Sequence, residues 1–459
     1  MKIFNSLSGK KEKVVSEVPS LRMFVDGPTV YDYSHLGHAK TYTQLDFMVR
    51  VLRTKFPVDV LMNITDVDDK IIKRAKELNT NPLQLAREFE KEFFKDMDWL
   101  GNTVYDKSAR AHDYVPEIIS QITRLIEKKH VYLVEGAGWY FDLSTAVRTS
   151  SVSGRNFTTS EEEYSRVATK HKRNPGDFAV WKFVKNNEPF WDSEILGAGR
   201  PGWHIEDTAI IESFFGHQID IHAGASDLLF PHHEAETIQM EALSDGKLFS
   251  KYWVHTGLLN VGDKKMGKSL KNFITIRSLQ DTWEPEVIRF FFLRSNYRSE
   301  LVFNEKYLAD TKALLDKVNL FYEEATHIDE PYELLELLEE TERLFFAALE
   351  DDFNSAAALS VLYDFINATN QKFRFKSGQR VRDFLNKINK IYKVFTFSED
   401  AKTAAWAGSD IQKIEELISL RNQYRAAKNW EAADEVRGLL KKMNVSVEDT
   451  ETGSRWIVK

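Results

Sequence analysis

Two histidines three residues apart, His35 and His38, are the first residues of this 459-residue chain whose types and spacing suggest chemistry. They lie in the stretch GPTVYDYSHLGHAK, residues 27–40, between the apolar run Leu21–Val25, which predicts a strand, and a segment that can be helical. A strand that ends at a glycine turn and enters a helix leaves backbone N–H groups pointing outward, which favours an anion. Two imidazoles at such a turn can add donors to a phosphate. The competing interpretation is an ordinary turn with surface histidines.

A second candidate is the basic, glycine-containing loop at residues 264–269, with the sequence KKMGKS. A lysine pair in a loop is most often a solvated surface feature. This pair falls in the same stretch of alternating strands and helices as the two histidines. It could therefore close over the same site although it is far away in the sequence.

The composition is that of an ordinary globular protein, with 42% hydrophobic residues, 29% charged residues and a net charge of −8. No apolar run reaches the length of a membrane span, and the N-terminus lacks the apolar core of a signal peptide. We expect a soluble, cytoplasmic monomer without membrane contacts, in which local patches hold any nucleic acid. The absence of cysteine excludes disulfides, thiolate nucleophiles, cysteine-ligated zinc and iron–sulfur clusters.

Alternating strands and helices predict an α/β fold with a parallel sheet. The run Val58–Ile64 has strand length, ends at a polar turn and precedes a helical stretch that starts near residue 71. Ligands of such sheets bind beyond the carboxyl ends of the strands, where both the HLGH turn and the TDVDD turn occur. The alternation breaks from about 102 to 201, which indicates an insertion. There is no GxGxxG motif, so a dinucleotide is not indicated.

HxGH near the start and KMxKS near the end of one α/β block together resemble class I aminoacyl-tRNA synthetases, and in particular the cysteinyl-tRNA synthetase family. The matching segments are GPTVYDYSHLGHAKTY (27–42), NITDVDDKIIKRA (63–75), GRPGWHIED (199–207), DIHAGASDLLFPHHEAE (220–236) and KKMGKSLKN (264–272). The segment RNQYRAAKNWEAADEVRGLL (421–440) resembles that family's anticodon-binding helices. The resemblance covers nearly the whole chain.

The resemblance implies a class I synthetase architecture. We expect a Rossmann-like catalytic domain in two halves, 1–101 and 199–248, around an inserted connective region, 102–198. A region that carries the KMSKS-type loop and contacts the tRNA stem follows at 249–304. An α-helical bundle at 305–400 and a small anticodon-binding module at 410–459 complete the chain.

The chemistry that the resemblance implies is ATP-dependent activation of cysteine, with Mg²⁺ accompanying ATP. The cysteine carboxylate attacks the α-phosphate, pyrophosphate leaves, and the cysteinyl group passes to the 3′ adenosine of tRNA(Cys). Preorganised donors and cations stabilise such a transition state. On this resemblance the catalytic residues are His35, His38, Lys265 and Lys268, and Gly37 and Asp227 join His35, His38 and Lys268 in binding ATP. The residues implied for the amino acid are Thr65, Trp203, Asp26 and Asp207.

The main departure from the family concerns its zinc site, which binds the substrate thiolate through two cysteines, one histidine and one glutamate. The matching positions here are Asp26, Asp207, His232 and Glu236. Carboxylates in place of thiolates keep the formal charge but make the site harder and less selective for zinc. Zinc, another divalent ion and a metal-free pocket that recognises cysteine by shape all remain open, and so does strict selection of cysteine over serine.

The C-terminal helices carry the candidate tRNA contacts Arg421, Arg425, Lys428, Trp430 and Arg437, which offer phosphate contacts and a stacking ring. The alternative is an amphipathic helix pair with exposed basic residues. Two other functions stay open at this point: a related ATP-dependent ligase with another amino acid or a non-tRNA acceptor, and a non-catalytic paralogue. Retention of all four catalytic residues argues against the paralogue.

Overall fold

The computed structural model describes residues 1–103, 105–146, 151–154, 171–185, 188–262, 264–265, 273–325, 331–372, 378–397, 408–443, 445–450 and 453–458. The chain forms two compact units. One comprises Met1–Leu315, Leu337–Phe365 and Asn386–Phe395, and the other comprises Asp316–Glu336, Ile366–Leu385 and Thr396–Lys459. All the predicted catalytic and metal-ligating residues belong to the first unit.

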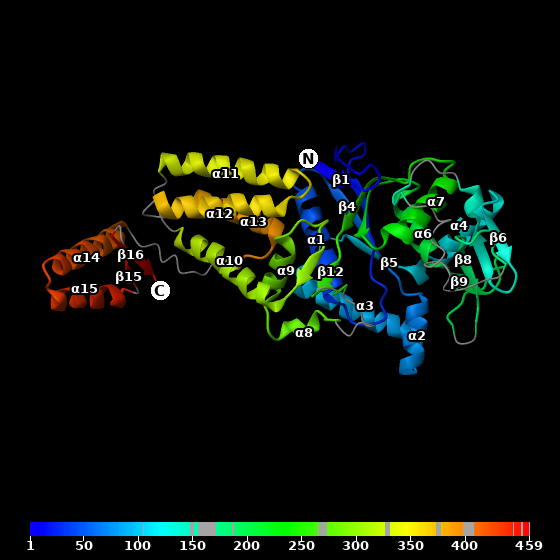
Figure 1. Ribbon diagram of the computed structural model, residues 1–459, viewed down its shortest axis with the longest axis horizontal. Helices are drawn as coiled ribbons and strands as arrows, with labels where there is room; N and C mark the ends of the chain where they lie inside the picture. The colour runs from blue at the N-terminus through cyan, green and yellow to red at the C-terminus, as the bar shows by residue number, and fades with distance from the viewer. Residues whose placement is uncertain are drawn as a thin grey trace. The chain divides into compact units, whose positions relative to one another are not determined.

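A parallel sheet of five strands, in the order β11-β10-β3-β4-β5, forms the centre of the first unit (Figure 1). The strands are β3 (Leu21–Val25), β4 (Val58–Ile64), β5 (Lys107–Arg110), β10 (Ile219–Ala225) and β11 (Ser250–Thr256). The predicted α/β fold is confirmed, and β3 and β4 have the predicted bounds. Because β3 pairs with both β4 and β10, residues from both sides of the insertion meet at the carboxyl end of β3.

Alternation along the strands assigns their side chains to two covered faces. Phe24 and Leu61 share one hydrophobic core with α4 (Val115–Glu127), α6 (Trp203–Phe215) and α7 (Glu234–Leu243). Val25 and Met62, one residue further along each strand, line an apolar cavity with residues of α1 (Leu36–Leu52) and α3 (Pro82–Trp99). A parallel sheet covered by helices on both faces explains why its strands are almost continuously apolar.

Polar caps set the helix starts around β4. α2 (Asp69–Leu78) begins after Asp68, whose carboxylate accepts a hydrogen bond from the Lys70 N–H. α3 begins after Asn81, whose side chain accepts from two backbone N–H groups, and Pro82 occupies the first helical position. These caps fix where the chain turns back towards the sheet.

The described part of the insertion contains α4 and most of an antiparallel sheet in the order β6-β7-β8-β9, whose last strand lies just past the expected end of the insertion at residue 198. Its strands are β6 (Val131–Val134), β7 (Gly138–Phe141), β8 (Phe178–Phe183) and β9 (Gly199–Pro201), with short 3-10 turns at Ala111–Tyr114 and Leu143–Thr145. The expected boundary between residues 101 and 102 falls before β5, which pairs with β4 in the parallel sheet. The short sequence KSAR is polar and mostly exposed, so it gave no hydrophobic signal for a strand.

The remaining described elements before residue 305 are short. They are the hairpin β1 (Lys2–Asn5) and β2 (Lys10–Lys13), the turn Leu229–His233, the sheet β13-β12-β14 (Lys264–Lys265, Leu259–Val261 and Leu301–Phe303), α8 (Arg277–Gln280) and α9 (Pro285–Leu293). β10 and β11 both belong to the parallel sheet, so the expected domain boundary at residue 248 also divides this sheet.

Four long helices occupy the region predicted as a helical bundle. They are α10 (Glu305–Glu324), α11 (Tyr332–Glu350), α12 (Ser355–Lys372) and α13 (Gln379–Tyr392). Among the described residues, no helix is long and apolar enough to cross a membrane.

The C-terminal module consists of α14 (Gly408–Ala426), α15 (Trp430–Lys442) and the hairpin β15 (Val445–Thr450) and β16 (Gly453–Val458). Its own small core contains Ile414, Ile418, Val436, Leu440 and Val445.

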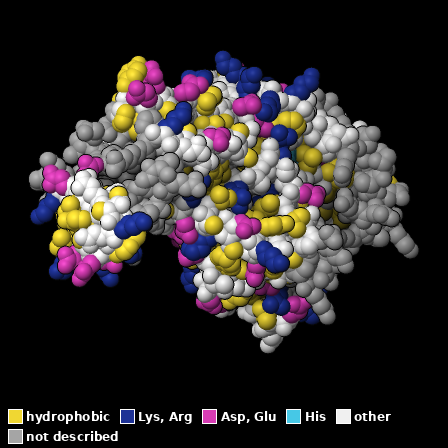
Figure 2. Space-filling view, turned by 60° about the vertical axis from the view of Figure 1, so that its left-hand side comes forward, with side chains coloured by type: hydrophobic (Ala, Val, Ile, Leu, Met, Phe, Trp, Pro, Cys, Tyr) yellow, Lys and Arg dark blue, Asp and Glu magenta, His cyan; other side chains and the backbone are white. Residues whose placement is uncertain are grey.

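Figure 2 shows Lys and Arg side chains interspersed with Asp and Glu over the face in view, in keeping with the lack of a general basic field.

Lys40 lies in the second turn of α1 and is completely buried. Its Nζ donates to Gln44 Oε1 at 2.9 Å and to the Gly257 carbonyl at 2.6 Å. Burial lowers the pKa of the Lys40 ammonium to about 7. The helix that carries His35 and His38 is thus tied to the chain after β11 by a titratable group.

This lysine predicts a pH-dependent stability. Between pH 7 and about 10.5 the unfolded chain binds a proton at Lys40 that the folded chain has lost, so this group makes stability rise with pH. The thermal midpoint of the wild type minus that of Lys40→Met should therefore increase from pH 7 to pH 9.5. Differential scanning calorimetry at both pH values checks this, and a difference that stays constant with pH would refute it.

Candidate active site

The two histidines of the HLGH turn cap the start of α1 and each other. His38 N–H donates to His35 Nδ1 at 3.2 Å, and His35 N–H donates to His38 Nδ1 at 3.4 Å. The two rings stack with centroids 3.8 Å apart. Because both Nδ1 atoms accept backbone hydrogen bonds, the neutral rings carry their protons on Nε2. The turn therefore presents two imidazole N–H donors at the N-terminus of a 17-residue helix, where the macrodipole also favours an anion.

The chain that leaves the KKMGKS loop pairs with this turn. Leu36 N–H donates to the Ile274 carbonyl at 3.0 Å, and Ile276 N–H donates to the Ser34 carbonyl at 3.0 Å. Lys265 belongs to β13, but the described structure does not extend to its side chain, and Lys268 lies outside the described residues. The pairing supports the prediction that loop and turn serve one site, while the lysine contacts stay predictions.

The four residues predicted to hold a metal come together in one buried cluster. Asp26 follows β3, Asp207 lies on α6, His232 lies in the turn before α7, and Glu236 lies on α7. His232 Nε2 lies 2.9 Å from Asp207 Oδ2, 3.6 Å from Glu236 Oε1 and 3.9 Å from Asp26 Oδ1. The side chains of all four residues are almost completely buried. Each offers a ligand atom within 4.8 Å of the others, so the residue set brings its donors together.

The donors of this cluster fit a divalent cation. Two ligands that are each about 2.1 Å from a tetrahedral ion lie roughly 3.4 Å apart, which the His232 distances bracket. Asp26 Oδ1 and both carboxylate oxygens of Glu236 have no hydrogen-bond partner among the described residues. Burial raises the pKa of Asp26, of Asp207 and, most strongly, of Glu236, because no solvent stabilises their charge. A cation would restore the charged forms of these carboxylates.

Asn63, at the end of β4, holds the two aspartates in place. Its side-chain amide donates to Asp207 Oδ1, and its Oδ1 accepts from the Gly27 N–H at 2.5 Å, directly after Asp26. A Cβ on Gly27 would lie 1.6 Å from the Asn63 carbonyl oxygen, so only glycine permits this approach. Sequence reasoning missed Asn63, although its place near the carboxyl end of a central parallel strand was a usable signal.

The predicted amino-acid and ATP residues surround the cluster and the turn. Trp203 stacks on the His232 ring, with centroids 4.3 Å apart. Thr65 is buried and accepts a hydrogen bond from the Asn63 amide at 3.3 Å. Gly37 lies in the first turn of α1, and Asp227 is exposed in the turn after β10. Their contacts with substrates stay predictions.

The predicted tRNA residues lie on α14, α15 and the turn between them. Lys428, Trp430 and Arg437 are exposed, with Trp430 at 59%. Arg421 is only 5% exposed and donates to the neighbouring Asn422 side chain. The predicted contact of Arg421 with a phosphate stays a prediction. Its burial shows that the side chain packs within the module.

A family model described as the class I (C) catalytic domain of tRNA synthetases matches residues 12–313, and a DALR domain model matches residues 344–397. The cysteine–tRNA ligases of Thermoplasma acidophilum and Mannheimia succiniciproducens are each 37% identical to this chain. The matches cover 99% of this chain and 100% and 99% of those proteins. The methionyl-tRNA synthetase of Mycobacterium tuberculosis in complex with methionyl-adenylate has a similar fold, with a TM-score of 0.61, 13% identity and coverage of 82% of this chain and 90% of that one.

The role of Asn63 is testable through metal affinity. Asn63→Ala removes the donor that orients Asp207, and loss of such an outer partner typically weakens metal binding by about 10–100-fold. We expect a fall of that size in Co²⁺ affinity, measured by competition with a chromogenic chelator. Asn260→Ala, which removes a surface bond to Glu300, is the matched control. Equal affinity of Asn63→Ala and the wild type would contradict the positioning role.

Proposed function

We propose that this chain, which belongs to the cysteine–tRNA ligase family of class I aminoacyl-tRNA synthetases, activates cysteine with ATP and transfers it to tRNA(Cys). The observation that carries the proposal is the convergence at the carboxyl end of β3. Asp26, one member of the buried Asp–His–Glu cluster, follows this strand directly, and the phosphate-binding turn at residues 35–38 comes next in the chain before α1. Tyr42 on α1 links them, because its hydroxyl donates to the Asp26 carbonyl at 3.1 Å.

ATP binds against the start of α1 in this proposal. The Nε2–H groups of His35 and His38 donate to the phosphates, and Gly37 leaves room for their close approach. Asp227 binds the ribose, while Lys265 and Lys268 neutralise the pyrophosphate that leaves, with Mg²⁺ accompanying the nucleotide. Negative charge grows on the phosphates in the transition state, so these fixed donors act on the rate of adenylation more than on substrate affinity.

Cysteine binds beside Thr65 and Trp203, with its side chain directed at the buried cluster. Asp26, Asp207, His232 and Glu236 would hold a divalent cation there, zinc or a harder ion. A bound cation would supply a ligand position that distinguishes a thiolate from the serine hydroxyl. The protein residues hold the donors in a dry site and exclude water, and Trp203 fixes the His232 ring by stacking.

The acceptor in this proposal is tRNA(Cys), read by the C-terminal module through Arg421, Arg425, Lys428, Trp430 and Arg437. The exposed Trp430 ring and the exposed basic residues around it support this role. A ligase for a small acceptor would not need such a module. We also propose that the enzyme acts as a monomer, which analytical ultracentrifugation of the full chain tests.

Amino-acid-dependent pyrophosphate exchange tests the function. Cysteine should support exchange, and transcribed tRNA(Cys) should then be charged. Thorough removal of transition metals, with Mg²⁺ restored for ATP, should lower the preference for cysteine over serine at least tenfold. Absence of cysteine-dependent exchange would refute the ligase, whereas exchange and selectivity that survive metal removal unchanged would refute only the cation.

The donor role of His38 gives a second test. His38→Ala should lower kcat for exchange by about 10²–10³-fold with little change in KM for cysteine, as expected for loss of a transition-state donor. The thermal midpoint controls for the lost cap, which is worth about 1 kcal/mol. His217→Ala, at an exposed position of the same domain, should leave kcat unchanged. A rise in cysteine KM with unchanged kcat would contradict the assignment.

A further inference from the structure

The carboxylates of Asp26 and Glu236 lie between His232 on one side and a second pair of histidines on the other. Asp26 Oδ1 lies 3.9 Å from His232 Nε2, whereas Asp26 Oδ2 lies 2.6 Å from His233 Nε2 and 3.9 Å from His222 Nδ1. Glu236 Oε1 lies 3.6 Å from His232 Nε2, whereas Glu236 Oε2 lies 3.0 Å from His222 Nε2. Each carboxylate thus directs one oxygen towards His232 and the other towards His222 or His233.

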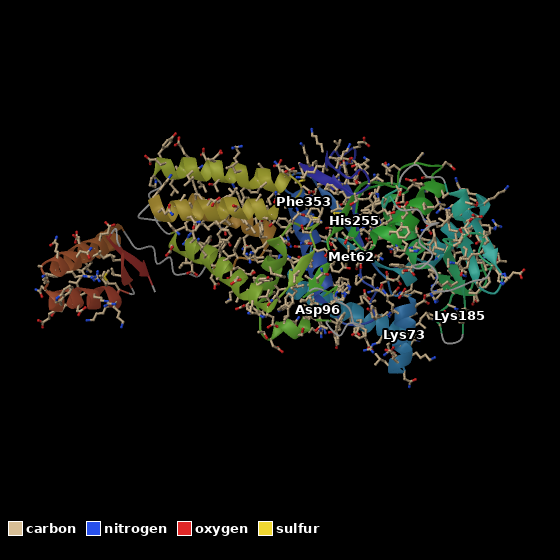
Figure 3. The ribbon with its side chains drawn as sticks, in the orientation of Figure 1. Met62, Lys73, Asp96, Lys185, His255 and Phe353 are labelled. Carbon is tan, nitrogen blue, oxygen red and sulfur yellow. The ribbon has the colours of Figure 1, made fainter. Side chains whose placement is uncertain are left out.

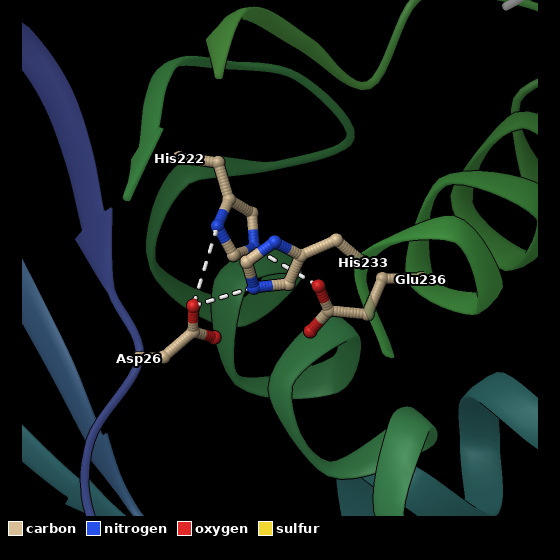
Figure 4. A group of neighbouring side chains, drawn as sticks. All are labelled: Asp26, His222, His233 and Glu236. Carbon is tan, nitrogen blue, oxygen red and sulfur yellow. Dashed lines mark hydrogen bonds and ion pairs between the residues drawn. The ribbon is translucent and has the colours of Figure 1, made fainter. Parts of the chain in front are cut away.

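We propose that the chain binds a second divalent cation, held by His222 and His233 and bridged to the first by the Asp26 and Glu236 carboxylates. Figure 4 shows these four side chains converging from β10, the turn before α7, the end of β3 and α7. The proposal rests on the first cation position of the proposed function. Two-ion sites have separations of about 3.5–4 Å, a spacing that a bridging carboxylate spans.

The buried polar atoms of His222 and Glu236 have no hydrogen-bond partner among the described residues, and a cation would bind to them. Neither ring nitrogen of His222 and neither carboxylate oxygen of Glu236 has a hydrogen bond among the described residues, and both side chains are fully buried. The 3.0 Å approach of the two groups therefore has no hydrogen-bond geometry. Leaving such groups unsatisfied is costly, and an ion between them satisfies both. The His222 ring is fixed for this role by stacking on Trp253, with centroids 4.3 Å apart.

A hydrogen-bonded chain behind His233 prepares it as a ligand. His233 Nδ1 lies 2.8 Å from His255 Nε2, and His255 Nδ1 lies 2.7 Å from Ser6 Oγ. His255, labelled in Figure 3, lies on β11. With protons donated from His233 towards Ser6, His233 Nε2 keeps a lone pair that faces Asp26. Metal-bound histidines have this arrangement, because an outer partner takes the other N–H. Protons donated in the opposite direction fit a cation-free site, so a cation selects the first direction.

The charge of the cluster also calls for more than one divalent ion. Asp26, Asp207 and Glu236 carry three negative charges when ionised, and Glu206 next to Asp207 is fully buried with both oxygens unpaired among the described residues. One divalent ion leaves a net negative charge in a dry site, whereas two balance the four carboxylates. The ligands are oxygen and imidazole nitrogen, which suit Zn²⁺, Co²⁺ or Mn²⁺.

Metal stoichiometry tests the second position. Full-length protein is stripped with chelator, loaded with Co²⁺, desalted and analysed by mass spectrometry of the metal. We expect two Co²⁺ per chain in the wild type and one in His222→Phe, which keeps the ring stack and removes the nitrogens. Asp207→Asn should also lose one. His217→Phe, at an exposed histidine, is the control and should keep two.

Loading with Mn²⁺ gives an independent readout, because two carboxylate-bridged ions should show exchange-coupled electron paramagnetic resonance signals in the wild type. One Co²⁺ per chain with no coupled Mn²⁺ signal would overturn the second position and leave the first intact. No bound metal would overturn both positions, while cysteine-dependent exchange would still decide the ligase separately. The wild-type stoichiometry and spectrum decide the matter even where His222→Phe fails to fold.

Discussion

Three carboxyl groups buried against one another are the constraint on which this site depends. Asp26, Asp207 and Glu236 each offer an oxygen to a cluster whose ligand atoms all lie within 4.8 Å of one another. Like charges at such distances repel by about 4 kcal/mol per pair even with substantial screening. Burial raises the pKa of all three groups, and repulsion from neighbouring carboxylates adds to the rise in the pKa of Asp207 and Glu236, so the protonated forms are favoured when no cation is bound. The elements around them, β3, α6 and α7, hold the groups together against this repulsion through packing and through Asn63.

A carboxylate differs from a thiolate in the number and direction of its donor atoms as well as in hardness. A thiolate has one donor atom, at the end of a short side chain. A carboxylate has two donor atoms that point in different directions, so Asp26 faces His232 with one oxygen and His233 with the other. Asp26 therefore lies between His232 of the predicted metal site and the neighbouring histidines His222 and His233.

The sequence predicted the parts of the fold that hydrophobic patterns specify. β3 and β4 are apolar runs that end at polar or glycine turns, so their bounds agree with the structure. The motifs also grouped Asp26, Asp207, His232 and Glu236, whose side chains lie close together in the structure, while their role as metal ligands stays a prediction. β5 was missed because an edge strand with exposed, polar residues has no such pattern. The burial of Arg421 was equally hidden, since one basic residue on a helix has no mark that separates the core side from the solvent side.

The linear sequence did not predict the roles of three residues, His222, His233 and Asn63. Their roles depend on which face of the sheet a residue occupies and on which neighbour lies across it. His222 pairs in register with Phe24 on one side and with Trp253 on the other. That register places the imidazole in the same layer as the Asp26 carboxylate, two residues beyond Phe24. Only the three-dimensional sheet order supplies this information.

Gly224 leaves the space that the Asp26 carboxylate occupies. A Cβ at this position would lie 2.1 Å from Asp26 Oδ2 and 3.1 Å from His233 Cε1. The volume that alanine would need is thus already filled by the longer side chain at position 26. Positions 26 and 224 cannot vary independently: a lineage that acquires aspartate at 26 loses the freedom to replace this glycine.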